Sequence, residues 1–154
     1  MNKLLLLLMI IPIIGFGQQT YVPDNNFEQE LINLGYDNVL DDYVLTANIN
    51  TVTSLDVNTQ SISDLTGIED FISLTHLHCA NNQLTSLDLI NNTALTYLEC
   101  QQNQITTLDL SNNTALTDLN CRHNQLTTLD VSNNPALNYF RCNDNELTSL
   151  DVRS

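Results

Sequence analysis

The sequence predicts a solenoid of stacked parallel β-strands, with a short helical cap at its N-terminal end and little other helix. Residues 74–154 consist of copies of one 21-residue block in constant register, the last copy being incomplete. Within a block apolar and polar residues alternate, as at Leu77, His78 and Cys79, and this period of two is typical of a strand with one buried face. Units this short stack, because none of them can bury its apolar side alone. The four blocks begin at Leu74, Leu95, Leu116 and Leu137.

The solenoid is expected to occupy residues 52–154, in about five units. A less regular unit, residues 52–73, precedes the four blocks and has one extra residue at Gly67. Strands in register lie roughly 4.7–4.9 Å apart, so equivalent positions form columns along the stack. The sequence stops within a unit at Ser154, which suggests a truncated solenoid. Its uncapped last strand is then open to edge-to-edge self-association.

Residues 1–17 have the pattern of a secretory signal peptide. Lys3 supplies a positive charge, an apolar run extends from Leu4 to Phe16, and a small residue, Gly17, precedes the expected cleavage point. A membrane anchor is the alternative, but the run is shorter than the ~20 residues that span a bilayer, and no second run follows. We therefore expect a secreted or outer cell-surface protein with no membrane span after signal cleavage.

The charge balance excludes two classes of partner. The chain has 18 acidic residues against four lysines and arginines, and the only lysine belongs to the leader. Binding to a phosphate backbone needs clustered Lys and Arg, which displace counterions. We therefore expect no nucleic-acid partner and no binding to an anionic membrane; the acidity suits solubility, cation association or a basic partner.

Residues 18–51 are expected to form an N-terminal cap that closes the first turn of the stack. Asn25 and Glu28 have the spacing of a capping box, which predicts a short amphipathic helix at about residues 25–34. Gly35 follows at a position where helices usually stop. The apolar stripe of this helix consists of Phe27, Leu31 and Leu34.

The cap also contains three aspartates, Asp37, Asp41 and Asp42. A calcium loop is one interpretation, but the glycine and the terminal glutamate of an EF-hand are missing. A solvated acidic turn is therefore the prediction.

The conserved letters of the blocks carry a family resemblance. The string Leu-x-x-Leu-x-Cys-x-x-Asn-x-Leu resembles the leucine-rich repeat in its cysteine variant. With the Leu-Asp-Leu or Leu-Asp-Val that follows, the unit looks like the short repeats of secreted Bacteroidetes proteins, and the first turn, residues 62–68, is similar to internalin-type repeats. The resemblance implies a leucine-rich-repeat solenoid that binds proteins or glycans. The string recurs, with apolar replacements, at residues 74–84, 95–105, 116–126 and 137–147.

The cysteine column is assigned to the scaffold. An even number of cysteines in an exported protein normally suggests disulfides. However, disulfide Cβ atoms must approach to roughly 3.8 Å, which is closer than neighbouring strands lie. We predict buried free thiols that act as small apolar residues, and a straight column does not converge tetrahedrally on zinc. The column consists of Cys79, Cys100, Cys121 and Cys142.

Two asparagine columns are also assigned to the scaffold. The side-chain amide has two donors and an acceptor, so it can satisfy backbone groups where the strand turns. The first column consists of Asn82, Asn103, Asn124 and Asn145. Its counterpart on the second half of each unit consists of Asn92, Asn113 and Asn134.

The side chains that flank the buried leucine and cysteine point outward, and they vary between units whereas the scaffold does not. Tyr97 and Tyr139 are anchors of the kind enriched in binding hot spots. Arg122 and Arg141 can hold a carboxylate in two-pronged fashion. We predict a ligand-binding face here, the alternative being an ordinary solvated sheet surface. The predicted face consists of His76, His78, Tyr97, Glu99, Asp118, Arg122, Tyr139 and Arg141.

Two groups of residues could be taken for metal sites. His76, His78 and Glu99 include metal-binding side chains, but the two histidines lie too far apart on an extended strand to close on one ion. A column of aspartates places like charges one rung apart, where they repel. Neighbouring Thr and Ser hydroxyls are expected to offset this repulsion, and bridging calcium is the alternative. The column consists of Asp88, Asp109, Asp130 and Asp151.

Catalysis and cofactor binding are not expected, because the sequence has no Gly-rich phosphate loop, nucleophile elbow or paired-histidine metal motif. Two functions remain. The first is an extracellular recognition module that binds protein or polysaccharide through the strand side of the solenoid. The second is a structural spacer or adhesin stalk segment of a larger secreted protein, in which the rungs are interchangeable.

Overall fold

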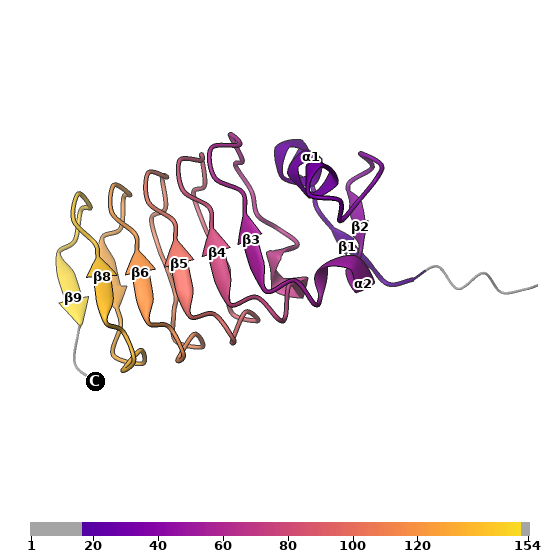
Figure 1. The fold of residues 1–154 in the computed structure, drawn as a ribbon. Coiled ribbons are helices and arrows are strands. Elements are labelled where there is room, and N and C mark those ends of the chain that lie inside the picture. The colour runs from indigo at the N-terminus through magenta and orange to yellow at the C-terminus, as the bar shows by residue number, and fades with distance from the viewer. Residues whose placement is uncertain (1–16, 152–154) are drawn as a thin grey trace, which may run out of the picture.

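The computed structural model describes residues 17–151 and shows a stack of turns with a cap at its N-terminal end (Figure 1). The predicted signal peptide, residues 1–17, lies outside the described residues apart from Gly17. Between residues 17 and 151, no helix has the length and apolar character that a membrane crossing needs.

A five-stranded parallel sheet runs along one side of the stack (Figure 1). Each strand pairs in register with the strand of the next unit, as Leu77 does with Leu98. This sheet confirms the prediction of a parallel-strand solenoid of about five turns with little helix. Its strands are β3 (Ser54–Asp56), β4 (His76–His78), β5 (Tyr97–Glu99), β6 (Asp118–Asn120) and β8 (Tyr139–Arg141).

The inward side chains of this sheet form the core of the stack. The central residue of each strand points inward, and the residue two positions later does so again. A fully buried leucine contributes about 1.5–3 kcal/mol relative to an exposed one, and here the neighbouring units provide that burial. The fully buried members of these two columns are Leu55, Leu77, Leu98, Leu119, Val57, Cys79, Cys100 and Cys121.

The second half of each turn is mostly irregular. Two short strands occur there, β7 (Thr128–Asp130) and β9 (Ser149–Asp151), and they pair in parallel. Elsewhere buried asparagines hold the turns together: Asn113 donates from Nδ2 to the carbonyls of Leu89 and Asn92 in the preceding unit. Asn92 and Asn134 make the equivalent bonds.

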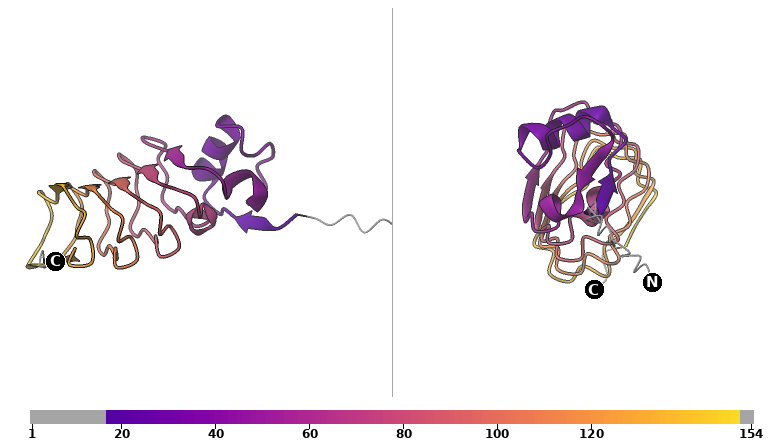
Figure 2. Two further views of the ribbon diagram at one scale, coloured as in Figure 1. Left: turned by 60° about the horizontal axis from the view of Figure 1, so that its bottom comes forward. Right: turned by 90° about the vertical axis from the view of Figure 1, so that its right-hand side faces the viewer.

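The cap contains more structure than the sequence predicted. The helix expected at 25–34 is present, but a two-stranded antiparallel sheet and a second short helix accompany it. Seen along the stack, the cap lies over the end of the first turns (Figure 2). The cap elements are β1 (Gln19–Tyr21), α1 (Asn25–Asn33), β2 (Tyr43–Leu45) and α2 (Thr46–Ile49), and a 3-10 turn, η1 (Ile68–Asp70), follows in the first unit.

The capping box predicted for α1 is wrong. Asp24 is the N-cap, and its carboxylate accepts hydrogen bonds from the backbone N–H groups of Asn26 and Phe27. Glu28 instead is fully buried and accepts from the N–H groups of Asp41 and Tyr43, 2.8 and 3.2 Å away. Leu34 was also predicted to belong to the buried stripe of the helix, but it is 42% exposed. Gly35 follows the end of the helix as predicted, with φ +81°.

Several contacts join the cap to the first unit, among them those of Asp24 and Gly67. The second oxygen of Asp24 accepts from the Ser63 N–H, the Ser63 hydroxyl and the Asp64 N–H at 2.7–3.1 Å. Gly67, the extra residue of that unit, has φ +105°, and a Cβ atom there would lie 2.9 Å from the Tyr21 carbonyl oxygen and 2.9 Å from Val22 Cγ2. Only glycine fits this close approach, which accounts for the irregular spacing.

Candidate functional site

The outward side of the five-stranded sheet, here called the strand face, is open along the stack. It consists of the first and third residue of each strand, because side chains alternate across a strand, and of the outward residues that follow β5 and β6. In order from the cap it presents Ser54, Asp56, His76, His78, Tyr97, Glu99, Gln101, Asp118, Asn120, Arg122, Tyr139 and Arg141.

Four predicted binding residues meet on β4 and β5. The Tyr97 ring on β5 contacts both histidine rings of β4, with centroids 5.7 Å from His76 and 5.0 Å from His78. His78 Nδ1 lies 3.0 Å from Glu99 Oε2. Aromatic pairs at such distances attract one another beyond the effect of burial, so the four side chains form one ordered group, here called the ring cluster.

The ring cluster changes the ionisation of its tyrosine. Partial burial, followed by the nearby Glu99 and Asp118 carboxylates, raises the pKa of Tyr97 to about 12. A side-chain hydrogen bond to Glu99 contributes to this shift, and the phenol therefore stays protonated to a higher pH than a free tyrosine does.

The other predicted binding residues form separate groups. The Arg141 guanidinium lies 4.8 Å from the centre of the Tyr139 ring, in a cation–π contact. Asp118 accepts a hydrogen bond from the adjacent Thr117 hydroxyl at 2.7 Å. Arg122 forms neither an ion pair nor a side-chain hydrogen bond with any described residue.

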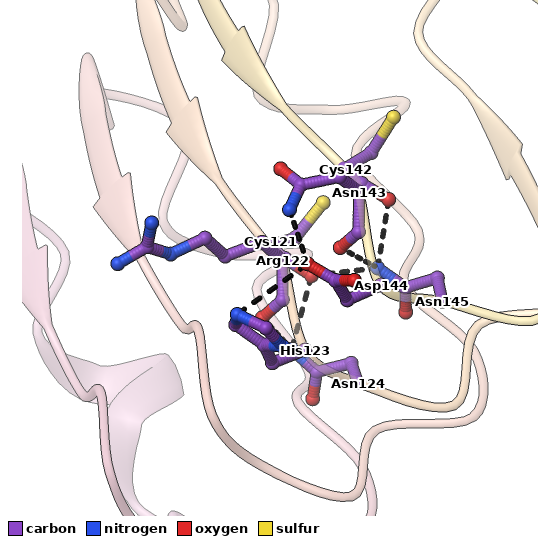
Figure 3. A network of polar contacts seen from close by, with 8 residues as sticks. All are labelled: Cys121, Arg122, His123, Asn124, Cys142, Asn143, Asp144 and Asn145. Atoms are coloured by element: carbon purple, nitrogen blue, oxygen red, sulfur yellow. Dashed lines mark hydrogen bonds and ion pairs between the residues drawn. The ribbon is translucent and has the colours of Figure 1, made fainter.

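A further contact at the edge of the strand face was not predicted. His123 Nε2 lies 3.4 Å from Asp144 Oδ2 on the next unit, and Figure 3 shows Arg122 extending away from this pair. His123 and Asp144 share a left-handed backbone conformation with the equivalent Asn81 and Gln102, with φ between 52° and 57°. The sequence gives only a partial sign of this turn, because asparagine, aspartate and histidine favour the left-handed conformation but glutamine does not.

The first asparagine column bridges neighbouring units directly beneath the edge of the strand face. Asn103 donates from Nδ2 to the carbonyls of Cys79 and Cys100 at 3.0 and 3.1 Å, and its Oδ1 accepts from the buried Leu84 N–H at 3.0 Å. Asn82, Asn124 and Asn145 make the corresponding bonds, some of which Figure 3 shows. These side chains hold the turns in register.

The four cysteines are free thiols in a file beneath the strand face. Cys79 and Cys121 donate from Sγ to the carbonyls of Glu99 and Arg141 on the next unit. Burial raises the pKa of all four, that of Cys121 to about 12. Because the thiolate is the reactive form, the buried thiols are unreactive.

Alkylation of the folded protein is therefore expected to begin at Cys142, the one cysteine that is not fully buried. Peptide mass spectrometry after brief iodoacetamide treatment at mildly alkaline pH checks this order, with urea-unfolded protein as the control in which all four react. Equal labelling of Cys100 and Cys142 in the folded protein would contradict the buried file.

The opposite flank of the stack is acidic. Shallow hollows of ≈ 350 and 270 Å³ lie there, lined mainly by Asp88, Asp109, Asp130 and neighbouring Ser and Thr residues. The hydroxyls of Thr85 and Ser86, and of the equivalent residues in other units, were expected to donate hydrogen bonds to these aspartates. Each carboxylate instead accepts a hydrogen bond from the backbone N–H two residues later. That bond and the Ser111 hydroxyl lower the pKa of Asp109.

The described residues contain no group of three or more His, Cys, Asp or Glu side chains placed to hold a metal ion. Neither His76, His78 and Glu99 nor the aspartate column forms such a group. The column includes Asp151, which pairs in register with Asp130 across β7 and β9.

Carboxylates lie on both sides of the stack, but the basic side chains of the described residues lie on one side. The basic side chains among the described residues all lie on the strand face or at its edge: His76, His78, Arg122, His123 and Arg141. The acidic flank has none. An acidic chain has therefore placed its described basic groups on the side that also carries its ring cluster.

Comparisons with known proteins agree with this architecture. Residues 72–113 match a family model described as leucine-rich repeats in two copies. Internalin J of Listeria monocytogenes serotype 4b is 46% identical over 73 residues, which is 47% of this chain and 8% of that protein. The chain thus spans a small part of this relative's length.

Two solved structures from Listeria monocytogenes are similar in fold. One is a functional domain of InlJ that includes a cysteine ladder; it is 45% identical, with a TM-score of 0.80 over 88% of this chain and 31% of that one. The other is internalin InlF, 24% identical, with a TM-score of 0.67 over 87% of this chain and 37% of that one, and it supports the fold alone. Residues 72–113 thus match leucine-rich repeats, and the chain is similar to internalin J in sequence and fold.

Proposed function

We propose that the strand face binds a protein partner, and that the chain is a non-catalytic recognition module rather than a spacer. The ring cluster carries this proposal. Tyr97 and its two histidine neighbours lie on an open surface, at positions that differ from unit to unit above a constant core. A spacer has no need of side chains that differ between rungs.

Two further features support the proposal. Tyrosine and arginine are the residues enriched at binding hot spots, and Tyr139 with Arg141 adds a second pair two units from Tyr97. Leucine-rich repeats of internalin-like type are typically protein-interaction modules. The leader pattern and the short unit length favour action outside the cell, in a secreted or surface protein of the Bacteroidetes type.

The test is the loss of a selected ligand on truncation of the two tyrosines. Peptides that bind the intact chain are selected from a random dodecapeptide phage library, and their affinities are measured by biolayer interferometry. Y97A/Y139A is expected to weaken binding by about 2 kcal/mol or more, roughly thirtyfold, because hot-spot aromatic residues lose this much on truncation.

The matched control is I72A/I90A, which removes two large side chains that are 57% and 53% exposed outside the strand face. It should bind the selected peptides as the parent does. Circular dichroism checks that both variants keep the parent fold. If Y97A/Y139A keeps the parent affinity for every selected peptide, the strand face is not the binding surface.

A further inference from the structure

Three polar side chains in the middle of the strand face have buried atoms without hydrogen-bond partners. Asn120 is only 6% exposed, and its Oδ1 accepts no hydrogen bond. Gln101 Oε1 and Arg122 Nε are also buried and unpartnered. Buried polar atoms are normally paired, because leaving one unpaired costs folding stability, and these three leave hydrogen-bonding capacity unused at one place on the strand face.

The three residues are neighbours on two adjacent rungs. Asn120 is the register partner of Glu99 between β5 and β6. Gln101 and Arg122 lie two positions further along the same two rungs, where the Gln102 N–H donates to the Arg122 carbonyl at 3.1 Å. Side chains two apart share a face, so Gln101, Asn120 and Arg122 form one patch beside the ring cluster, here called the polar trio.

The trio offers one cation and two neutral acceptors. Within the described residues both ion pairs join a histidine to a carboxylate, and neither involves Arg122. An unpaired guanidinium is conspicuous in a chain with a formal net charge of −14, where carboxylates are plentiful. The amide oxygens of Gln101 and Asn120 need N–H or O–H donors.

We propose that the polar trio recognises an aspartate or glutamate of the protein partner. The ligand carboxylate binds the Arg122 guanidinium through its two Nη groups. This contact turns the polar side chains outward, so that a neighbouring N–H of the ligand can donate to Asn120 Oδ1 or Gln101 Oε1. Charge complementarity selects this ligand, because the Arg122 guanidinium has neither an ion pair nor a ring contact within the described residues, whereas the Arg141 guanidinium lies against the Tyr139 ring. This inference rests on the proposed function of the strand face.

The test uses the peptides selected on the intact chain, which should share an Asp or Glu. R122Q is expected to weaken their binding by about tenfold to a hundredfold, because a charge-assisted contact is lost. D109N, a control on the acidic flank, should have no effect. A peptide whose acidic residue is replaced by the corresponding amide should bind the parent chain as weakly as the acidic peptide binds R122Q. The amide peptide should bind R122Q only slightly more weakly than the acidic peptide does.

Charge reversal sharpens the test. R122E should bind a peptide in which the acidic residue is replaced by lysine better than the parent chain binds it. Q101E should reduce binding of the acidic peptide, because the new carboxylate on the adjacent rung forms an ion pair with the Arg122 guanidinium and competes with the peptide. Circular dichroism confirms that each variant is folded.

The outcomes separate this inference from the proposed function. Peptides that depend on Tyr97 and Tyr139 but carry no shared acidic residue, or that bind R122Q as tightly as the parent, overturn the inference alone. Peptides insensitive to both tyrosines overturn the proposed function. Arg122-dependent binding of polygalacturonate, with no acidic peptide selected, would show that the trio serves an acidic glycan instead and would also overturn the inference.

Discussion

Asn103→Ala is expected to lower the free energy of unfolding by about 3 kcal/mol, a large part of the 5–15 kcal/mol typical of a domain. The change removes four hydrogen bonds, the longest of which, at 3.4 Å, runs from Nδ2 to the Gln101 carbonyl. The carbonyls of Cys79 and Cys100 each keep a second asparagine donor, Asn82 and Asn124. The Leu84 N–H keeps none and is left buried and unpaired, which is the most costly part of the change.

Urea unfolding followed by circular dichroism measures this loss. Asn91→Ala, at an exposed asparagine, is the control and should shift stability by no more than about 0.5 kcal/mol. Asn145→Ala removes the same bonds from a partly exposed unit and should cost less than Asn103→Ala. A midpoint for Asn103→Ala equal to that of Asn91→Ala would show that the column does not hold the turns together.

Asp24→Ala is expected to cost a similar amount, about 3 kcal/mol, because it removes both an N-cap and the bonds between the cap and the first unit. The five bonds to Asp24 reach Asn26, Phe27, Ser63 and Asp64. Asp42→Asn is the control, since that aspartate lies on an exposed turn of the same cap and asparagine tolerates its left-handed backbone, with φ +68°. Equal midpoints for the two variants in urea would contradict the role assigned to Asp24.

The same residue predicts a pH dependence. Burial raises the pKa of Asp24, but the hydrogen bonds from Ser63, Phe27 and Asn26 outweigh it and place the pKa below its ordinary value of 3.8. A lowered pKa stabilises the fold above the unfolded-state value, and this stability is lost as the pH falls through the folded-state value. The difference in stability between the parent and Asp24→Asn should therefore be constant near neutral pH and shrink below about pH 4.

The inward and turn positions of the repeats could be predicted because the same pattern of residues recurs in each unit. Four copies fix the inward positions of Leu77 and Cys79 and the turn position of Asn82, so an error in one copy is corrected by the others. The resemblance to leucine-rich repeats added the expectation of a binding role, and it rests on the same repeated residues.

The cap and the fine structure of the face could not be predicted in the same way. The cap occurs once, and its contacts are long-range: Glu28 fits a capping box locally, whereas its partners lie at Asp41 and Tyr43. On the strand face the alternation correctly placed Asn120 on the outward side of β6, but it gave no indication that neighbouring side chains bury it. Such burial depends on the particular side chains of three adjacent rungs.

Hydroxyl-radical footprinting of the chain with a selected peptide tests the binding face most directly, because it reads the solvent exposure of individual side chains. Oxidation of Tyr97 and Tyr139 should fall when the peptide is bound, while oxidation of Ile90, which is 53% exposed beside the acidic flank, should not change. If Ile90 is protected while both tyrosines are oxidised as fast as in the absence of peptide, the ligand lies on the opposite side of the stack and the proposal is contradicted.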